Sequence, residues 1–431
     1  MRYKLKIILS LILLPLIFAS SAWAALEIER GPIYGLLRKV LPFENLELAG
    51  FLKNETALRT AHGLDEFMKE SNIVQLEAEY TFNENVQFFT ILKWFYDSVY
   101  DLENRYDRDP KWESKTNKKL KHPEKQQWLR ECYIDILTDS VDIRAGKQQV
   151  VWGTADGVRI LDIINPLDYR EWTLKDYIDS RLPLWMLNVE GKILLNGHLQ
   201  LLLIPDYEAN YYPPAGAPFT LRTVRLGAES IQALTNAGVT VNTIDQKPVR
   251  TFENTKVGLR WRQILEGQGF EYTLNYLNTY SFASAAYTQF QFGFPPVFSL
   301  TRRAEKINVF GGTFSKTITE GIMLPGLGKG WTLRGEFAYI TGDAMNIGTD
   351  KVIKQTSPNT VDVDQYNYVL GLDKTFFTNL MFSFQFIQMW ARATESYDTS
   401  QYTLLNGATR GPLDECETIL TLLLGTDFLH E

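Results

Sequence analysis

The chain has 431 residues, of which 13% are aromatic and 22% are charged, and its formal net charge is −7. The negative charge argues against a nucleic-acid-binding surface. The mean hydropathy of −0.18 is too low for a bundle of transmembrane helices.

The first residues have the pattern of a secretory signal peptide. Three basic residues precede the apolar run 7–18, and Ala22-Trp23-Ala24 supplies small residues around a cleavage point. The apolar run is shorter than the ~20 residues that span a bilayer comfortably. We therefore predict a signal peptide at 1–24, a short periplasmic segment at 25–45 and one membrane domain at 46–431.

The membrane domain begins with clear two-residue alternation. In 72–82, apolar residues such as Val74 and Leu76 alternate with Gln75 and Glu77, which is typical of a strand with one apolar and one aqueous face. The short turn 83–85 leads into a second such segment and predicts a hairpin. Similar segments recur near 48–55, 86–96, 128–138, 141–152, 185–195, 199–204, 270–282, 307–317, 331–341, 366–377, 380–390 and 417–428. With the strand expected after 253, they predict about fourteen strands.

The connections between these strands alternate in length. Long ones fall at about 60–71, 98–127, 153–183, 208–253, 283–304, 343–365 and 392–415. This alternation predicts an antiparallel transmembrane β-barrel with short periplasmic turns and long extracellular loops. A Gly-rich connection at 318–330 predicts a small periplasmic excursion or a bulged strand end.

A soluble β-sandwich or β-helix is the alternative fold, but neither has a reason to alternate loop lengths or to place polar residues on its enclosed face. We therefore expect an all-β barrel in the outer membrane of a Gram-negative bacterium. Its partners would be outer-membrane lipids and the barrel assembly machinery, with no nucleic acid.

The sequence ends without the usual terminal aromatic residue. Residues 429–431 resemble the entry to another hairpin. We expect further strands, up to sixteen or more, because an unclosed edge would leave backbone groups unpaired in lipid; closure at fourteen strands is the alternative.

Catalytic motifs are absent from the sequence. Only four histidines occur, and neither a metalloprotease motif nor a serine-nucleophile elbow is present. His62 is the one candidate for a barrel hydrolase, yet no serine or carboxylate pattern accompanies it. We expect no enzyme activity, no cofactor and no metal.

One charged motif follows the strand predicted at 141–152. Its candidate residues are Lys147, Gln148, Trp152, Gly153, Asp156, Gly157, Arg159, Asp162, Asn165, Asp168, Arg170 and Glu171. Trp152 is expected at the outer membrane interface, and the mixed charges allow loop 153–183 to fold inward and constrict a pore. An outward cap is the alternative. A calcium site from the clustered oxygen ligands is conceivable, but the spacing matches no EF-hand loop.

This motif carries a resemblance to a known family. Gly146-Lys147-Gln148, Trp152-Gly153 and Asn165-Pro166-Leu167-Asp168 resemble the signature of the bacterial outer-membrane family called domain of unknown function thirteen hundred and two. Segments 48–55 and 183–185 resemble other strands of that family, which is similar to the alginate-export barrels. The resemblance implies a channel beside a resistance-nodulation-division type exporter and a periplasmic partner protein, handling lipid-like or other hydrophobic compounds.

Three classes of function remain open. The first is an outer-membrane transport channel with loop 153–183 as its constriction. The second is a non-conducting scaffold or surface-binding protein, favoured by the apolar patch Tyr211-Tyr212-Pro213-Pro214 in a long loop. The third is a barrel hydrolase, which the histidine content disfavours.

Overall fold

The computed structural model describes most of the predicted membrane domain. The described residues are 26–27, 45–59, 66–102, 128–171, 175, 177–193, 197–215, 217–265, 267–318, 329–348, 360–377, 379–394, 403–405, 412–413 and 416–426. The predicted signal peptide, His62, most of connection 318–330 and the final residues 427–431 lie outside them.

The chain forms two compact units. The first comprises Met1–Asn83, Gln87–Cys132 and Gly216–Pro218, and the second comprises Glu84–Val86, Tyr133–Ala215 and Phe219–Glu431. Each is described by itself below.

The first unit contains the predicted amino-terminal strands. β2 (Leu46–Arg59) pairs antiparallel with β3 (Glu66–Asn83), with a bulge between Ala57 and Leu58. The two residues of β1 (Leu26–Glu27) pair with β2, within the segment predicted to be periplasmic. The unit also includes most of β4 (Val86–Asp97), the short helix α3 (Val99–Leu102) and the start of β5 (Leu129–Leu137).

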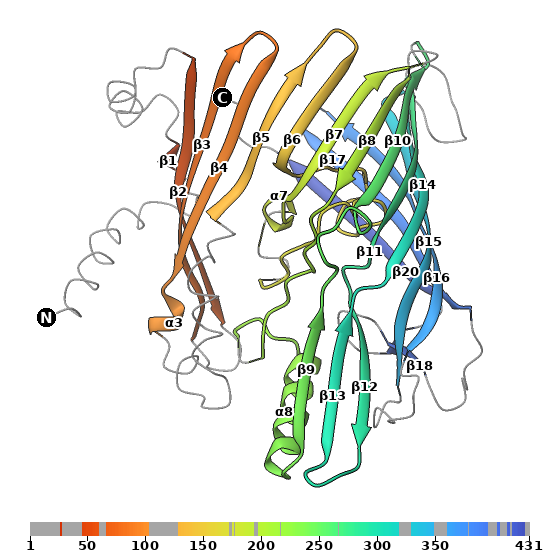
Figure 1. Ribbon diagram of the computed structural model, residues 1–431. Helices are drawn as coiled ribbons and strands as arrows, with labels where there is room; N and C mark the ends of the chain where they lie inside the picture. Colours follow the sequence, from red (N-terminus) through yellow and green to blue (C-terminus); the bar gives the residue numbers. More distant parts are fainter. Residues whose placement is uncertain are drawn as a thin grey trace, which may run out of the picture. The chain divides into compact units, whose positions relative to one another are not determined.

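The second unit is built on ten long strands (Figure 1). They are β6 (Val141–Gln148), β7 (Leu184–Lys192), β8 (His198–Ile204), β10 (Lys256–Leu265), β11 (Phe270–Tyr280), β14 (Lys306–Thr317), β15 (Trp331–Gly348), β16 (Thr360–Phe376), β17 (Leu380–Ala393) and β20 (Cys416–Thr426). Each pairs antiparallel with the next in this order. With β2, β3, β4 and β5, the described residues form the fourteen long strands that the alternation predicted.

The strands of the second unit separate two chemically different faces. On one face, Leu274, Leu370 and Leu420 are 61%, 47% and 64% exposed. Asn275, which follows Leu274 and so points to the other face, is buried. An exposed apolar face suits contact with lipid chains. The backbone groups of the strands suit the same place, because they are hydrogen-bonded to the neighbouring strands. The fold is therefore that of the antiparallel transmembrane β-barrels, as predicted. We call the lipid-facing side the outer face and the opposite side the inner face.

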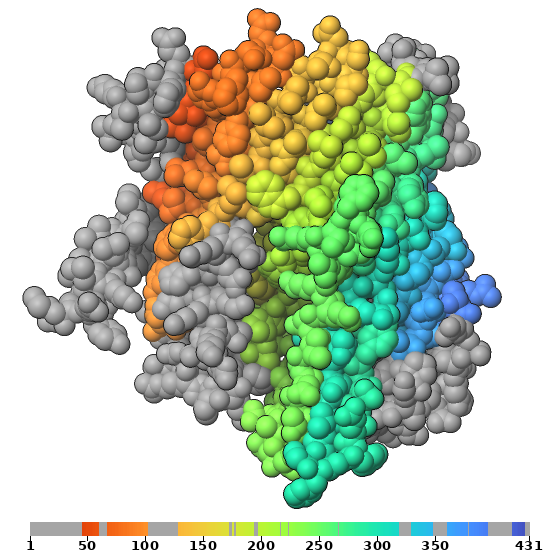
Figure 2. Space-filling view, in the orientation of Figure 1, coloured from red at the N-terminus to blue at the C-terminus, as the bar shows by residue number. Residues whose placement is uncertain are grey.

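Two connections predicted as plain loops, 208–253 and 283–304, instead form a small α+β module. It consists of α8 (Arg222–Asn236), β9 (Thr240–Gln246), β12 (Ala285–Gln291) and β13 (Val297–Arg303), with β13 paired antiparallel to β12 and parallel to β9. Phe298 and Leu300 are buried against apolar residues of α8. This α8 module projects beyond the ends of the long strands (Figures 1 and 2).

The remaining elements are small. They are α7 (Tyr177–Ser180), β18 (Thr403–Leu405) and β19 (Pro412–Leu413), and β18 pairs with the end of β15. No helix in the described part of the chain is long and apolar enough to cross a membrane.

Candidate functional site

The candidate site consists of residues 149–171, 175 and 177–183, which we call the inner loop because they lie against the inner face of the second unit. The sequence predicted strand structure through Trp152, but β6 ends at Gln148. The Asn165 side chain closes the neck of the loop, accepting a 2.8 Å hydrogen bond from the Val150 amide and donating one of 2.9 Å to the Leu182 carbonyl. The segment departs from the ladder there because these side-chain bonds replace strand pairing.

Trp152 does not lie at the membrane interface, so that prediction is wrong. The indole is 1% exposed and donates a 2.7 Å hydrogen bond to Gln200 on the inner face of β8. It packs over Gly258 of β10, where an added Cβ would lie 2.9 Å from the indole ring. A tryptophan suits either place, because its ring is apolar and its N–H needs a partner; here the partner is inside.

Apolar side chains of the inner loop pack against the strands. Ile160, Leu161 and Ile164 are each 1% exposed and belong to one cluster with Val309 of β14 and Ala338 of β15. Burial of three such side chains contributes about 1.5–3 kcal/mol each. This cluster holds the returning half of the loop on the inner face.

The tip of the inner loop is bound by a single carboxylate, that of Glu336 on β15. Glu336 accepts backbone hydrogen bonds from Thr154 at 2.6 Å, from Ala155 at 3.2 Å and, on its other oxygen, from Leu161. The glycine at 153 permits this approach, because a Cβ there would lie 2.9 Å from the Glu336 carboxylate. Charge-assisted bonds of this kind are about twice as strong as neutral ones.

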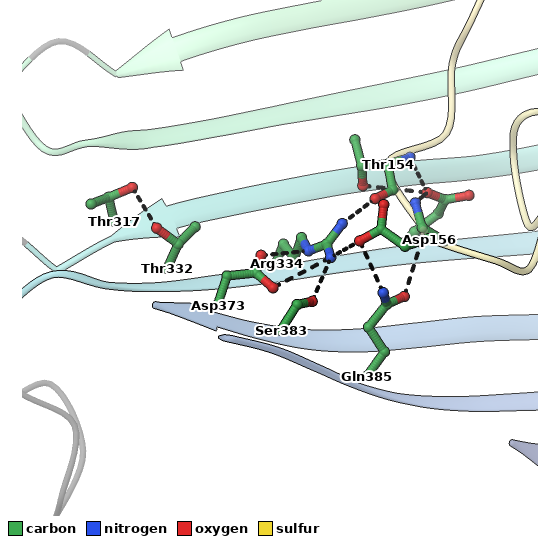
Figure 3. Close-up of polar contacts among 10 residues, drawn as sticks. Thr154, Asp156, Thr317, Thr332, Arg334, Asp373, Ser383 and Gln385 are labelled. Atoms are coloured by element: carbon green, nitrogen blue, oxygen red, sulfur yellow. Dashed lines mark hydrogen bonds and ion pairs between the residues drawn. The ribbon is translucent and has the colours of Figure 1, made fainter. Parts of the chain in front are cut away.

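A second polar cluster surrounds Arg334, two residues before Glu336 (Figure 3). Its guanidinium donates to the Asp156 carboxylate and to the Thr154 carbonyl of the loop. From the strands, Asp373 on β16 forms a 2.7 Å ion pair with it and Ser383 on β17 accepts a 3.2 Å hydrogen bond. Gln385, also on β17, donates a 3.0 Å bond to Asp156.

These contacts mean that the inner loop crosses the inner face. The neck of the loop lies at the adjoining ends of β6 and β7, whereas its tip is bound to β15 and β17. In the pairing order, β7, β8, β10, β11 and β14 separate β6 from β15. Arg334 is also near the start of β15, at the end of the sheet where a tight turn joins β10 to β11, whereas the loop leaves β6 at the opposite end. The loop thus reaches both across and along the inner face.

The carboxyl-terminal half of the loop is fixed by ion pairs. The buried Asp168 carboxylate contacts Arg170 at 2.6 Å and Lys175 at 2.7 Å. Burial alone would raise the pKa of Asp168, but Lys175 and Arg170 together hold it well below its usual range. Asp162 forms a 2.8 Å pair with Arg181, while Arg159 lies 3.9 Å from Asp162 and donates to the Asn165 carbonyl.

The patch Tyr211-Tyr212-Pro213-Pro214 packs on this loop. The Tyr169 amide donates a 2.7 Å bond to the Tyr211 carbonyl, and the Tyr169 and Tyr212 rings stack with their centroids 5.5 Å apart. The Arg170 guanidinium lies 5.3 Å from the centre of the Tyr211 ring. The aromatic patch thus supports the inner loop, which removes the feature that favoured a surface-binding loop there.

The structure brings most of the predicted motif residues together, and three of them remain to be placed. Lys147 lies on the opposite face of β6 from the buried Gln148. Gly157, with a φ of +79°, forms the open turn at the tip, and a Cβ there would meet no atom within 4 Å. Glu171 lies 3.9 Å from Lys175, beside the Asp168 pairs.

The carboxylates conceivable as calcium ligands do not converge. Asp156 pairs with Arg334, Asp162 with Arg181 and Asp168 with Arg170, so each has its own cation. Among the described residues no cluster of three or more metal-ligating side chains occurs.

The residues that receive the loop were not all identified from the sequence. Alternation within the predicted strand 331–341 places Arg334 and Glu336 together on its polar face, but it does not indicate which of them contacts the loop, and Gln200, Asp373 and Gln385 were not singled out. Polar residues at inward positions of apolar strands are the signal that could have found them.

The fold and this loop define a transmembrane β-barrel protein with an inward-folded loop, a class found in bacterial outer membranes. The chain belongs to the family described as "Protein of unknown function (DUF1302)", whose model matches residues 64–420. None of the curated proteins compared with the chain matches it.

Solved outer-membrane proteins resemble the chain remotely. OmpT of Vibrio cholerae with loop L8 deleted is 8% identical, with 89% of each chain covered and a TM-score of 0.41. Salmonella typhi OmpF in complex with daunomycin is 10% identical, with 84% of this chain and 82% of that chain covered and a TM-score of 0.40. Pseudomonas aeruginosa OccK5 (OpdH) is 10% identical, with 83% of each chain covered and a TM-score of 0.32.

Proposed function

We propose that this protein is a non-enzymatic channel of the outer membrane, in which a solute passes along the inner face and the inner loop narrows its path. The observation that carries the proposal is the attachment of the loop tip to Glu336 and Arg334 on β15, which several strands separate from the neck of the loop at β6. A loop that only capped the outside would have no reason to pair with wall residues near the start of β15, at the end of the sheet opposite to the one where the loop leaves β6. The tip is held by polar bonds, which water and ions can replace, and this suits a constriction better than a permanent seal.

Planar-bilayer recording tests the proposal. The folded protein should insert and give discrete current steps, and a variant lacking residues 155–159 should give larger ones because the tip is gone. Absence of current from both folded proteins would contradict channel function. Equal currents from both would contradict the role of the loop.

The cargo and the partners rest on the family resemblance. We propose lipid-like or other hydrophobic compounds as cargo, and a resistance-nodulation-division type exporter with a periplasmic protein as partners. Chemical cross-linking in cells followed by mass spectrometry tests the partners. Cross-links to assembly factors and lipids alone would contradict this part of the proposal.

Surface binding is the second candidate function, and the α8 module is the observation that favours it. Phe292 and Phe294, between β12 and β13, are 95% and 104% exposed. Exposed aromatic residues are frequent where proteins bind partners. If the protein is a channel, a variant with both residues changed to serine should conduct as the unchanged protein does. If the function is surface binding, the same variant should lose the attachment of a partner.

A further inference from the structure

The Arg334 guanidinium is held by the strands independently of the inner loop. Asp373 and Ser383, on two different strands, contact it at 2.7 and 3.2 Å. Its side chain is 16% exposed. Removing the loop would therefore leave the cation in place on the inner face, with its direction fixed by these two contacts.

The loop contributes one carboxylate to this cation, and that carboxylate is accessible to solvent. The Asp156 side chain is 56% exposed, in contrast to Asp162 and Asp168 at 6% and 5%. An ion pair with an exposed partner contributes little to stability, because solvent screens the charges. Asp156 is the weakest of the loop's three aspartate attachments.

Two wall donors converge on the same oxygen of Asp156. Arg334 Nη2 and Gln385 Nε2 both donate to Oδ2, the latter at 3.0 Å (Figure 3). Arginine and an amide placed together form a complete recognition site for a carboxylate. A Cβ added at the neighbouring Gly157 would meet no atom within 4 Å, and the Asp156 side chain is itself more than half exposed, so the ion pair is open to solvent on this side.

We propose that Asp156 occupies the binding site of a carboxylate group carried by the solute, and that a solute carboxylate displaces Asp156 from Arg334 and Gln385 and so loosens the tip of the inner loop. The inference deepens the proposed function and rests on it. It assigns Arg334 and Gln385 as the residues that select an acidic solute and Asp156 as the built-in competitor. The Glu336 bonds to the Thr154, Ala155 and Leu161 amides remain, so only the turn around Asp156 and Gly157 moves.

Isothermal titration calorimetry on the detergent-folded protein tests the inference without requiring conduction. Hexanoate is the probe, because it carries a carboxylate on a short apolar chain; acetate separates the contribution of the chain, and hexanol and inorganic phosphate test the head group. Hexanoate should bind Asp156→Asn at least tenfold more tightly than the unchanged protein, because the competing charge is gone. Arg334→Gln should abolish this binding, and Gln385→Leu should weaken it.

The Asp135–Arg144 pair provides the matched control. Arg144 contacts Asp135 at 2.7 Å between β6 and β5, away from the loop tip. Asp135→Asn removes a carboxylate from an inner-face arginine in the same way and should not increase hexanoate affinity. Heat-modifiable migration on gels shows that each variant is folded.

Three results would overturn the inference: equal affinity of Asp156→Asn and the unchanged protein, equal gains from Asp156→Asn and Asp135→Asn, or binding of phosphate as tight as that of hexanoate. Binding with these predicted differences in a protein that passes no current would leave the carboxylate site standing and contradict only the proposed channel.

Discussion

The Thr154 backbone amide donates a 2.6 Å hydrogen bond to the Glu336 carboxylate, although 182 residues separate the two along the chain. With the Ala155 and Leu161 amides on the same carboxylate, this contact fixes how far the inner loop extends over the inner face. Glu336 is therefore the wall residue on which the position of the loop tip depends most.

Glu336→Leu should release the tip. Three backbone donors lose their acceptor, and each unpaired buried donor costs about 1–3 kcal/mol. Hydrogen exchange by mass spectrometry should show faster exchange in peptides covering 152–162, with the long strands unchanged. Glu336→Gln keeps one acceptor oxygen, so its exchange rate in these peptides should lie between those of the unchanged protein and Glu336→Leu. Unchanged exchange in Glu336→Leu would contradict the role of Glu336 in holding the loop tip.

Gly258→Val should displace Trp152. A Cβ at 258 lies 2.9 Å from the indole and 3.3 Å from Leu202, so the ring must move or the strand must shift. Overpacking of this kind costs about 1–3 kcal/mol, which should appear as a lower Tm. The control is Gly227→Ala in α8, where a Cβ meets nothing within 4 Å; it should not lower the Tm, and an equal fall in both would refute the packing explanation.

The inner loop should stay attached in mild acid. Since the pKa of Asp168 is depressed in the folded protein by Lys175 and Arg170, its pairs contribute stability above the unfolded-state pKa of about 3.9 and lose it only as the pH falls further. Limited proteolysis of residues 168–181 should be equally slow at pH 7 and pH 5. Asp168→Asn should be cleaved faster at both, because breaking a buried pair costs about 3 kcal/mol.

The α8 module should be separable from the channel. Leu300→Ala removes a buried side chain from its core, a change that costs about 2–5 kcal/mol. Hydrogen exchange should rise in α8 and β13 while single-channel conductance stays constant. A changed conductance would show that the module contributes to the path of the solute.

Much of the fold could be predicted because two-residue alternation is local. The segment 270–282 shows it plainly, and β11 is found at 270–280 with the predicted faces. The same alternation put Arg334 and Glu336 on the inner face, but no local pattern could identify their partners on a loop about 180 residues earlier.

The errors have physical causes. Trp152 was assigned to the interface because tryptophan is common there, but a hydrogen-bond acceptor, Gln200, holds it inside. The α8 module was missed because β9 pairs in parallel with β13, a contact between segments more than 50 residues apart. Propensity within each segment could not reveal that pairing.

The most direct test of the account is the single-channel conductance of the double variant Arg334→Ala/Glu336→Ala beside Asp135→Asn. The double variant removes the two charged wall partners of the loop tip without shortening the chain, and the control removes an ion pair between β5 and β6. We predict a larger or rapidly fluctuating conductance for the double variant and an unchanged one for the control. A folded double variant with the same steady conductance as the unchanged protein would contradict the claim that the inner loop constricts the channel.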